Sequence, residues 1–167
     1  MKLFKLTLLF IISSCLTKNA ASQDVLMNIL TQNSGIINIG GTVFLEITVC
    51  NKSSTTAIPV YKLRPQISFP LEIVNIPDTG HVLPPGWKIT SNAGGVIRLS
   101  NGTDEIPLHE CRTILIAANG KAVGGPSTIS GTLTFSNGIA PGTAPGAATP
   151  GDNPADNTST TTVKIIK

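Results

Sequence analysis

Apolar and polar residues alternate with a period of two along much of the chain. The run TVFLEITVC at residues 42–50 places aliphatic side chains on one face of an extended chain and Glu46 and Thr48 on the other. This alternation is typical of a strand with one buried face. Shorter runs of the same kind lie at residues 25–30, 66–76, 87–90, 96–99, 113–118, 128–135 and 159–166.

Turn-forming residues rich in Gly, Pro and Asn separate these runs, and no window of eleven residues has helical periodicity. Short strands with turn signals between them predict an all-β fold. We therefore expect residues 23–167 to form one antiparallel β-sandwich of about seven or eight strands, with immunoglobulin-like topology.

One long segment interrupts the strand pattern. Residues 136–157 contain three Pro-Gly pairs, which begin at Pro141, Pro145 and Pro150. Long loops inside compact domains are usually functional or disordered. The three prolines are therefore candidates for partner contact, with a mobile hairpin insertion as the alternative.

The first 22 residues have the pattern of an export signal. A basic start, an apolar stretch at residues 6–12 and small polar residues up to Ser22 are typical of a secretory signal peptide, and the apolar stretch is too short to span a membrane. Small residues at Ala20 and Ser22 predict cleavage before Gln23. The alternative is a lipobox ending at Cys15, which would carry a lipid and attach the protein to the outer membrane.

The charge of the chain changes when this signal is removed. The full chain has 12 Lys+Arg, 9 Asp+Glu and a formal net charge of +3, but Lys2, Lys5 and Lys18 all belong to the signal. The mature chain is therefore neutral. A neutral chain without basic clusters does not suit nucleic acid, whose binding requires many phosphate contacts.

Two cysteines remain after cleavage, Cys50 at the end of one predicted strand and Cys111 just before another. An even number in an exported chain predicts a disulfide. Closing a loop of about sixty residues would stabilise the fold by about 4 kcal/mol in the chain-entropy view. Free thiols, or a nucleophilic Cys111 with His109 as its base, are the alternatives.

Other chemistry is sparse, and we expect no catalytic residue and no cofactor. The sequence contains no HExxH, Walker loop, CxxC or nucleophile elbow. His81 lies in a predicted turn, where a solvated side chain is expected. Asp152, Asn153 and Asp156 are the one set of clustered oxygen ligands, a weak candidate for calcium because two carboxylates fall short of its usual ligand number.

Three Asn-x-Ser/Thr triplets begin at Asn51, Asn101 and Asn157. They matter as glycosylation sites only in a eukaryotic secretory pathway, and the bacterial features of the export signal favour plain turn chemistry. Trp87 follows Pro-Pro-Gly and is the one aromatic ring with a turn context that suits an exposed sugar platform.

Two segments, TVFLEITVCNKSS at residues 42–54 and GDNPADNTSTTTVKIIK at residues 151–167, resemble the immunoglobulin-like "conserved repeat" domain of bacterial cell-surface proteins. The resemblance implies an extracellular β-sandwich used in adhesion, spacing or assembly, in a secreted protein of the Bacteroidota type. The family usually occurs as tandem repeats, whereas a single copy follows the signal here. This departure favours an accessory or subunit role.

Together these observations favour a non-catalytic secreted or cell-surface domain that binds a protein partner, as a subunit of an adhesin, filament or gliding-type assembly. The last predicted strand, with Thr161, Val163 and Ile165, is a candidate for pairing with a partner strand. A carbohydrate-binding module that uses Trp87 is the alternative, so a glycan partner stays open.

The intact mass of the protein recovered after export tests the processing site. We expect the mass of a chain that starts at Gln23, because the residues before it suit an ordinary signal peptidase. A mass that fits a chain starting at lipidated Cys15 would contradict this prediction.

Overall fold

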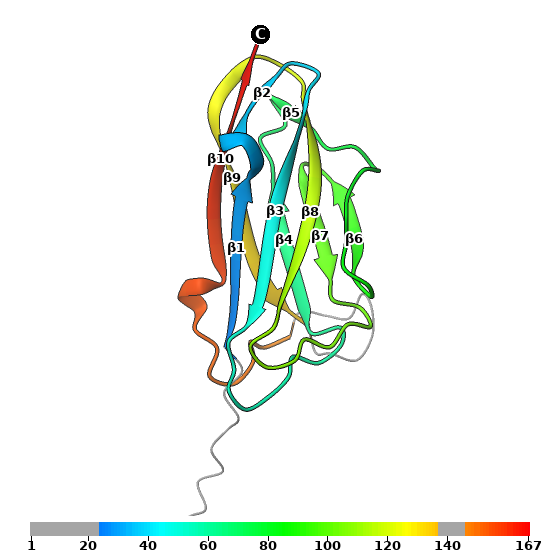
Figure 1. Ribbon diagram of the computed structural model, residues 1–167, viewed down its shortest axis with the longest axis vertical. Helices are drawn as coiled ribbons and strands as arrows, with labels where there is room; N and C mark the ends of the chain where they lie inside the picture. The colour runs from blue at the N-terminus through cyan, green and yellow to red at the C-terminus, as the bar shows by residue number, and fades with distance from the viewer. Residues whose placement is uncertain (1–23, 137–145) are drawn as a thin grey trace, which may run out of the picture.

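The computed structural model describes residues 24–136 and 146–167, so the predicted export signal, Cys15, Pro141 and Pro145 lie outside the described residues. Within the described ranges the chain forms strands and two short 3-10 helices. Two sheets pack face to face, with their strands along the long axis of the molecule (Figure 1).

One sheet has four strands in the order β1–β3–β8–β5. Its longest pair, β3 and β8, is antiparallel and in register from Thr42 opposite Asn119 to Cys50 opposite Cys111. The strands are β1 (Val25–Thr31), β3 (Thr42–Asn51), β5 (Val74–Asn75) and β8 (Cys111–Gly120).

The other sheet has six strands in the order β2–β10–β9–β4–β7–β6. All its pairs are antiparallel except β2 with β10, which run parallel. The strands are β2 (Ile36–Asn38), β4 (Leu63–Ser68), β6 (Lys88–Ala93), β7 (Val96–Ser100), β9 (Gly124–Phe135) and β10 (Thr158–Ile166).

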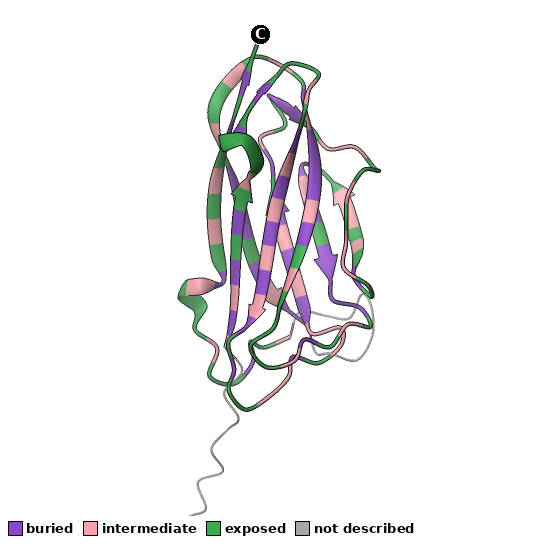
Figure 2. Cartoon of the chain, viewed as in Figure 1, coloured by how far each residue is buried: buried purple, intermediate pink, exposed green. Residues whose placement is uncertain are grey.

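The core lies between the sheets and comes from the alternation seen in the sequence. Val43, Leu45, Ile47 and Val49 of β3 are each at most 1% exposed, while the residues between them face outward. Ile114 and Ile116 of β8 oppose them within the same sheet and are fully buried. The banding of buried and exposed residues along the strands is visible in Figure 2. These buried aliphatic side chains supply the main driving force for folding.

The chain crosses from the four-stranded to the six-stranded sheet between β1 and β2, through η1 (Gln32–Gly35). The crossing needs left-handed backbone at Asn33, Ser34 and Gly35, with φ of 53°, 57° and 70°. A Cβ on Gly35 would lie 2.2 Å from the carbonyl oxygen of Thr162, so only glycine fits.

The predicted β-sandwich is confirmed, although the described residues form ten strands where about seven or eight were expected. Seven of the eight predicted runs overlap a single strand of the structure. Residues 66–76 are the exception, because the amides of Ile73 and Val74 turn back to the carbonyl of Pro70. The chain thereby leaves β4 in one sheet and enters β5 in the other. The short parallel strand β2 was not predicted.

Candidate functional site

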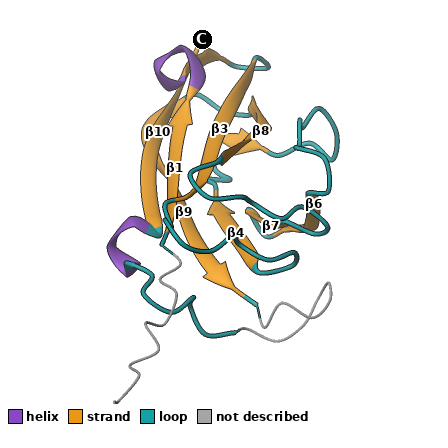
Figure 3. Ribbon diagram, turned by 60° about the horizontal axis from the view of Figure 1, so that its bottom comes forward, coloured by secondary structure: helices purple, strands orange, loops and turns teal. Residues whose placement is uncertain are grey.

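Three long connections lie together at one end of the sandwich, which we call the loop end (Figure 3). They are the β3–β4 connection (residues 52–62), the β7–β8 connection (residues 101–110) and the described parts of the β9–β10 connection (residues 136 and 146–157). The second 3-10 helix, η2 (Pro154–Asp156), belongs to the last of these. Binding residues are often carried by loops that a rigid scaffold positions.

The predicted disulfide is present at this end. Cys50 and Cys111 lie directly opposite each other in β3 and β8, with their Cα atoms 4.0 Å apart. Their side chains lie on the outer face of the four-stranded sheet, and Cys111 is exposed. Because its sulfur is bonded to Cys50, Cys111 offers no thiol nucleophile to the neighbouring His109.

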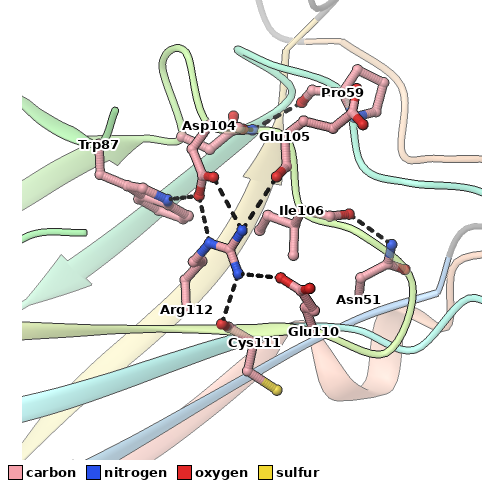
Figure 4. A network of polar contacts seen from close by, with 10 residues as sticks. Asn51, Pro59, Trp87, Asp104, Glu105, Ile106, Glu110, Cys111 and Arg112 are labelled. Atoms are coloured by element: carbon pink, nitrogen blue, oxygen red, sulfur yellow. Dashed lines mark hydrogen bonds and ion pairs between the residues drawn. The ribbon is translucent and has the colours of Figure 1, made fainter. Parts of the chain in front are cut away.

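A polar cluster joins the two sheets at the loop end (Figure 4). Arg112 of β8 donates from Nε to Asp104 Oδ2 (2.8 Å) and from Nη2 to Asp104 Oδ1 (3.2 Å). The indole Nε1 of Trp87, next to β6 in the other sheet, donates to the same Oδ2 at 2.7 Å. We call Trp87, Asp104 and Arg112 the sheet clasp.

The guanidinium of Arg112 also holds the loop that precedes β8. It donates to the carboxylate of Glu110 (2.9 Å) and to the backbone carbonyl of Glu105 (3.3 Å). Hydrogen bonds to Asp104 and then Glu110 raise the pKa of Arg112 above its already high value. Arg112 is therefore permanently charged and fixed by paired, charge-assisted bonds.

Two buried amides fix the backbone of the same loops. Asn101 is fully buried, accepts from the amide of Leu63 (3.0 Å) and donates to the carbonyls of Pro59 and Asp104. Asn51 is 1% exposed, donates to the carbonyl of Ile106 (3.0 Å) and accepts from the amide of Ser53. Each amide links the β3–β4 connection to the β7–β8 connection.

The asparagines of the three Asn-x-Ser/Thr triplets therefore have structural roles. Asn51, Asn101 and Asn157 are 1%, 0% and 7% exposed. Asn157 lies just before β10 and donates from Nδ2 to Asp152 at 2.6 Å. All three side chains are buried and hydrogen-bonded within the fold, and Asn51 is the last residue of β3. The interpretation of the triplets as turn chemistry stays a prediction.

Asp152, Asn153 and Asp156, the calcium candidates, lie near the start of β1. Asp152 accepts from the amide of Val25 at 3.2 Å, and Asp156 forms an ion pair with Lys52 at 3.3 Å. The carboxylate oxygen Oδ2 of Asp156 and both oxygens of Asp152 thus already have protein donors. Across residues 24–136 and 146–167, no group of three or more His, Cys, Asp or Glu is placed to hold a metal ion. Asp156 Oδ1 and Asn157 Oδ1 are buried and have no hydrogen-bond partner among the described residues. Calcium binding stays a prediction.

Burial raises the pKa of the Asp152 carboxyl, and the nearby charges of Asp156 and Asp24 raise it further. The hydrogen bonds from Asn157 and Val25 lower it, but only in part. The net direction is upward, so the folded protein binds a proton at Asp152 more readily than the unfolded chain does.

Lys62 fixes the two described ends of the β9–β10 connection. Its ammonium donates to the carbonyls of Ser136 (3.0 Å) and Ala147 (3.1 Å), and the amide of Gly146 donates to the carbonyl of Phe135. The connection therefore leaves and returns to the sandwich at one place. Pro150, the one partner-contact proline among the described residues, is exposed.

Trp87 is not the exposed sugar platform that its turn context suggested. The side chain is 6% exposed, packs in the core and donates to Asp104. Pro84, Pro85 and Gly86 form the turn, and the amide of Trp87 donates to the carbonyl of Pro84. The interpretation of Trp87 as a glycan-binding residue is wrong.

The last strand is also less available than the sequence suggested. Val163 and Ile165 are 1% exposed and belong to the core, so they offer no side chain to a partner, while Thr161 is half-buried. β10 lies between β9 and β2, and its start lies beside β1, whose Ile29 amide donates to Ser159 Oγ at 3.0 Å. Pairing of a partner strand with β10 stays a prediction.

His81 is held by the fold and is not simply solvated. The amide of Ala117 donates to its Nδ1 at 3.1 Å, so a neutral ring carries its proton on Nε2, which donates to the carbonyl of Pro77 at 2.9 Å. The ring covers part of the open edge of β8 next to the bridge between Val82 and Leu115. His109, by contrast, is exposed and has left-handed backbone.

Sequence reasoning missed the sheet clasp and the two buried amides. Asp104 and Arg112 lie in ordinary turn and strand-start contexts, and no local pattern pairs them with Trp87. The Asn-x-Ser/Thr triplets did mark Asn51 and Asn101, although that pattern points to glycosylation as well as to turns. In the part of the chain that the structure covers, no helix has the length and apolar character needed to cross a membrane.

No protein family and no curated protein matches this chain. Solved structures do match. A cohesin module from a Clostridium perfringens family 33 glycoside hydrolase has a TM-score of 0.50 at 12% identity, over 87% of this chain and 97% of that one.

Two further structures are similar to a lesser degree. The CARDB domain of a Pyrococcus furiosus protein, in complex with di-metal ions, has a TM-score of 0.48 at 12% identity, over 87% of this chain and 90% of that one. A Nocardia farcinica protein with an immunoglobulin-like fold has a TM-score of 0.46 at 16% identity, over 82% of this chain and 98% of that one. At 12% identity the likeness to the cohesin module concerns the fold alone, and the two packed sheets show that fold to be a β-sandwich.

Asp104→Ala tests the sheet clasp. We expect the free energy of unfolding to fall by about 2–4 kcal/mol, because Arg112 and the indole of Trp87 lose their common acceptor in a partly buried place. Urea unfolding measures this loss. The matched control is Glu105→Ala, an exposed neighbour, which should change stability by about 0.5 kcal/mol or less. Equal effects of the two substitutions would contradict the role of the clasp.

The raised pKa of Asp152 predicts a pH dependence with a definite sign. Because the folded state binds the proton of Asp152 more tightly than the unfolded chain does, the ionised carboxylate lowers the free energy of unfolding. This loss of stability disappears as the pH falls from the folded-state pKa towards about 3.9, the usual pKa of Asp in an unfolded chain. Relative to Asp152→Asn, the wild-type protein should therefore become more stable on acidification. Urea unfolding of both proteins over that range is the measurement, and a constant or opposite difference would contradict it.

Proposed function

We propose that this chain is an exported, non-catalytic immunoglobulin-like domain that binds another protein through its loop end. The observation that supports this most directly is the fixed geometry of that end. The sheet clasp, Asn51, Asn101 and Lys62 together hold the loops against the sandwich. Loops that are ordered before binding lose less conformational entropy when a partner docks.

The surface that these loops present is mixed in character. It combines exposed apolar, hydroxyl and charged groups, as is common at interfaces between proteins that associate reversibly. Exposed residues of the three connections include Ser54, Pro59, Thr103, Leu108, His109 and Pro150. Leu108, with 38% of its surface exposed, is the large apolar side chain among them.

Features that would support catalysis are weak at this end. The sulfur of Cys111 is bonded to Cys50, and the carboxylates of Asp104 and Glu110 are paired with Arg112. His109 lies on the loop before β8 and is exposed to solvent. These contacts favour binding over chemistry.

The finer parts of the proposal come from the sequence. The predicted export signal favours a secreted or cell-surface location, with attachment through lipidated Cys15 as the alternative. The resemblance to bacterial conserved repeat domains favours a subunit of an adhesin, filament or gliding-type assembly. The fold similarity to a cohesin module is compatible with a binding role and does not identify the partner.

Substitutions at Leu108 and Leu71 test which end binds. Leu108 lies at the loop end and Leu71 precedes β5 at the opposite end, and their exposures of 38% and 39% are closely matched. We expect Leu108→Ser to lower capture of envelope proteins by the immobilised exported protein at least several-fold, and Leu71→Ser to leave it unchanged. Quantitative mass spectrometry of the captured proteins is the measurement. Equal capture by both variants, or no capture by the wild-type protein, would contradict the proposal.

A further inference from the structure

The first strand of the sandwich pairs with a neighbouring strand on one side only. β1 pairs with β3 over seven residues, from Val25 opposite Asn51 to Thr31 opposite Leu45, and it forms the edge of the four-stranded sheet. Across its other edge it bonds to β10 through side chains, such as Ser159 Oγ to the amide of Ile29 (3.0 Å). As the edge strand of its sheet, β1 (blue in Figure 1) has a neighbouring strand in that sheet on one side only.

The slot that β1 fills is specific for its sequence. Val25, Met27 and Ile29 are at most 2% exposed. Gly131 of β9 leaves the space that two of them occupy, because a Cβ there would lie 2.8 Å from Met27 Cε and 3.3 Å from Ile29 Cγ2. If β1 left, the core and the edge of β3 would be open, and a strand with the same spacing of side chains would be needed to fill them.

The connection after β1 has left-handed backbone at three consecutive described residues. These are Asn33, Ser34 and Gly35, and the first two are not glycine. The tight crossing of the chain from one sheet to the other imposes this conformation. If the connection opened, all three residues could take extended backbone, which any residue adopts easily.

We propose that two copies of this chain exchange β1, so that residues 25–31 of each copy fill the slot of the other. The contacts of β1 with β3 and β10 are then remade between copies, and the strained crossing is replaced by an extended connection. Short, strained hinges favour this kind of exchange. The exchange of β1 does not depend on a partner at the loop end. If no exchange is found, the proposed function still stands, and if no partner binds the loop end, the exchange can still occur.

A pair of cysteines distinguishes the two arrangements. Leu30 and Glu46 lie directly opposite each other in β1 and β3, and both have side chains on the outer face of the sheet. With Leu30→Cys and Glu46→Cys in one chain, an oxidised closed monomer has an internal bond, whereas an exchanged dimer has bonds between chains. The exported protein is refolded at high concentration, separated by size and run on a non-reducing gel.

We expect the dimer fraction to contain covalently linked chains, and the monomer fraction to contain only internal bonds. A second variant tests the hinge without threatening the fold. Asn33→Gly with Ser34→Gly removes the cost of left-handed backbone from the closed form, so the dimer fraction should fall several-fold. Ser54→Gly, in an exposed loop, is the control and should leave the fraction unchanged.

Two results would overturn the proposal. One is a gel with only internal bonds at every protein concentration. The other is a hinge variant whose dimer fraction equals that of the Ser54→Gly control.

Discussion

The carboxylate of Asp104 accepts hydrogen bonds from Arg112 and from the indole of Trp87, and the geometry of the loop end depends on this contact. Arg112 begins the inner face of β8 in one sheet, and Trp87 precedes β6 in the other. At this end of the sandwich the aliphatic core gives way to polar groups, which must find partners because water is largely excluded. The clasp satisfies them and joins the two sheets at this end.

The same requirement explains the buried asparagines. Where β3 and β7 end, the chain has backbone amides and carbonyls that no strand pairs, and Asn51 and Asn101 bond to several of them at once. A short side chain with both a donor and an acceptor suits this position, and an aliphatic residue would leave those groups without partners. The loops are therefore held by side chains from the scaffold, which favours a binding surface that exists before the partner arrives.

The sequence predicted the elements that are determined by residues close together in the chain. Alternation in residues 42–50 and 113–118 predicted the central strands, and the even number of cysteines after the predicted export signal predicted the bond between Cys50 and Cys111. The predictions were wrong where residues far apart in the sequence determine whether a side chain is buried. Trp87 followed an ordinary turn signal, yet its ring is turned inward to reach Asp104, seventeen residues further along. Val163 and Ile165 alternate with polar residues like those of any half-buried strand, and only their burial in the core shows that they offer no side chain to a partner.

Buried side chains hold the loops of this end as firmly as backbone hydrogen bonds hold the strands of the sheets. Native-state hydrogen exchange at the amides of Ser53 and Leu63 tests it directly, because these amides donate to Asn51 and Asn101. The account predicts that both exchange only through global unfolding, as slowly as the amides of central β3. Exchange at rates typical of open loops, while β3 stays protected, would contradict it.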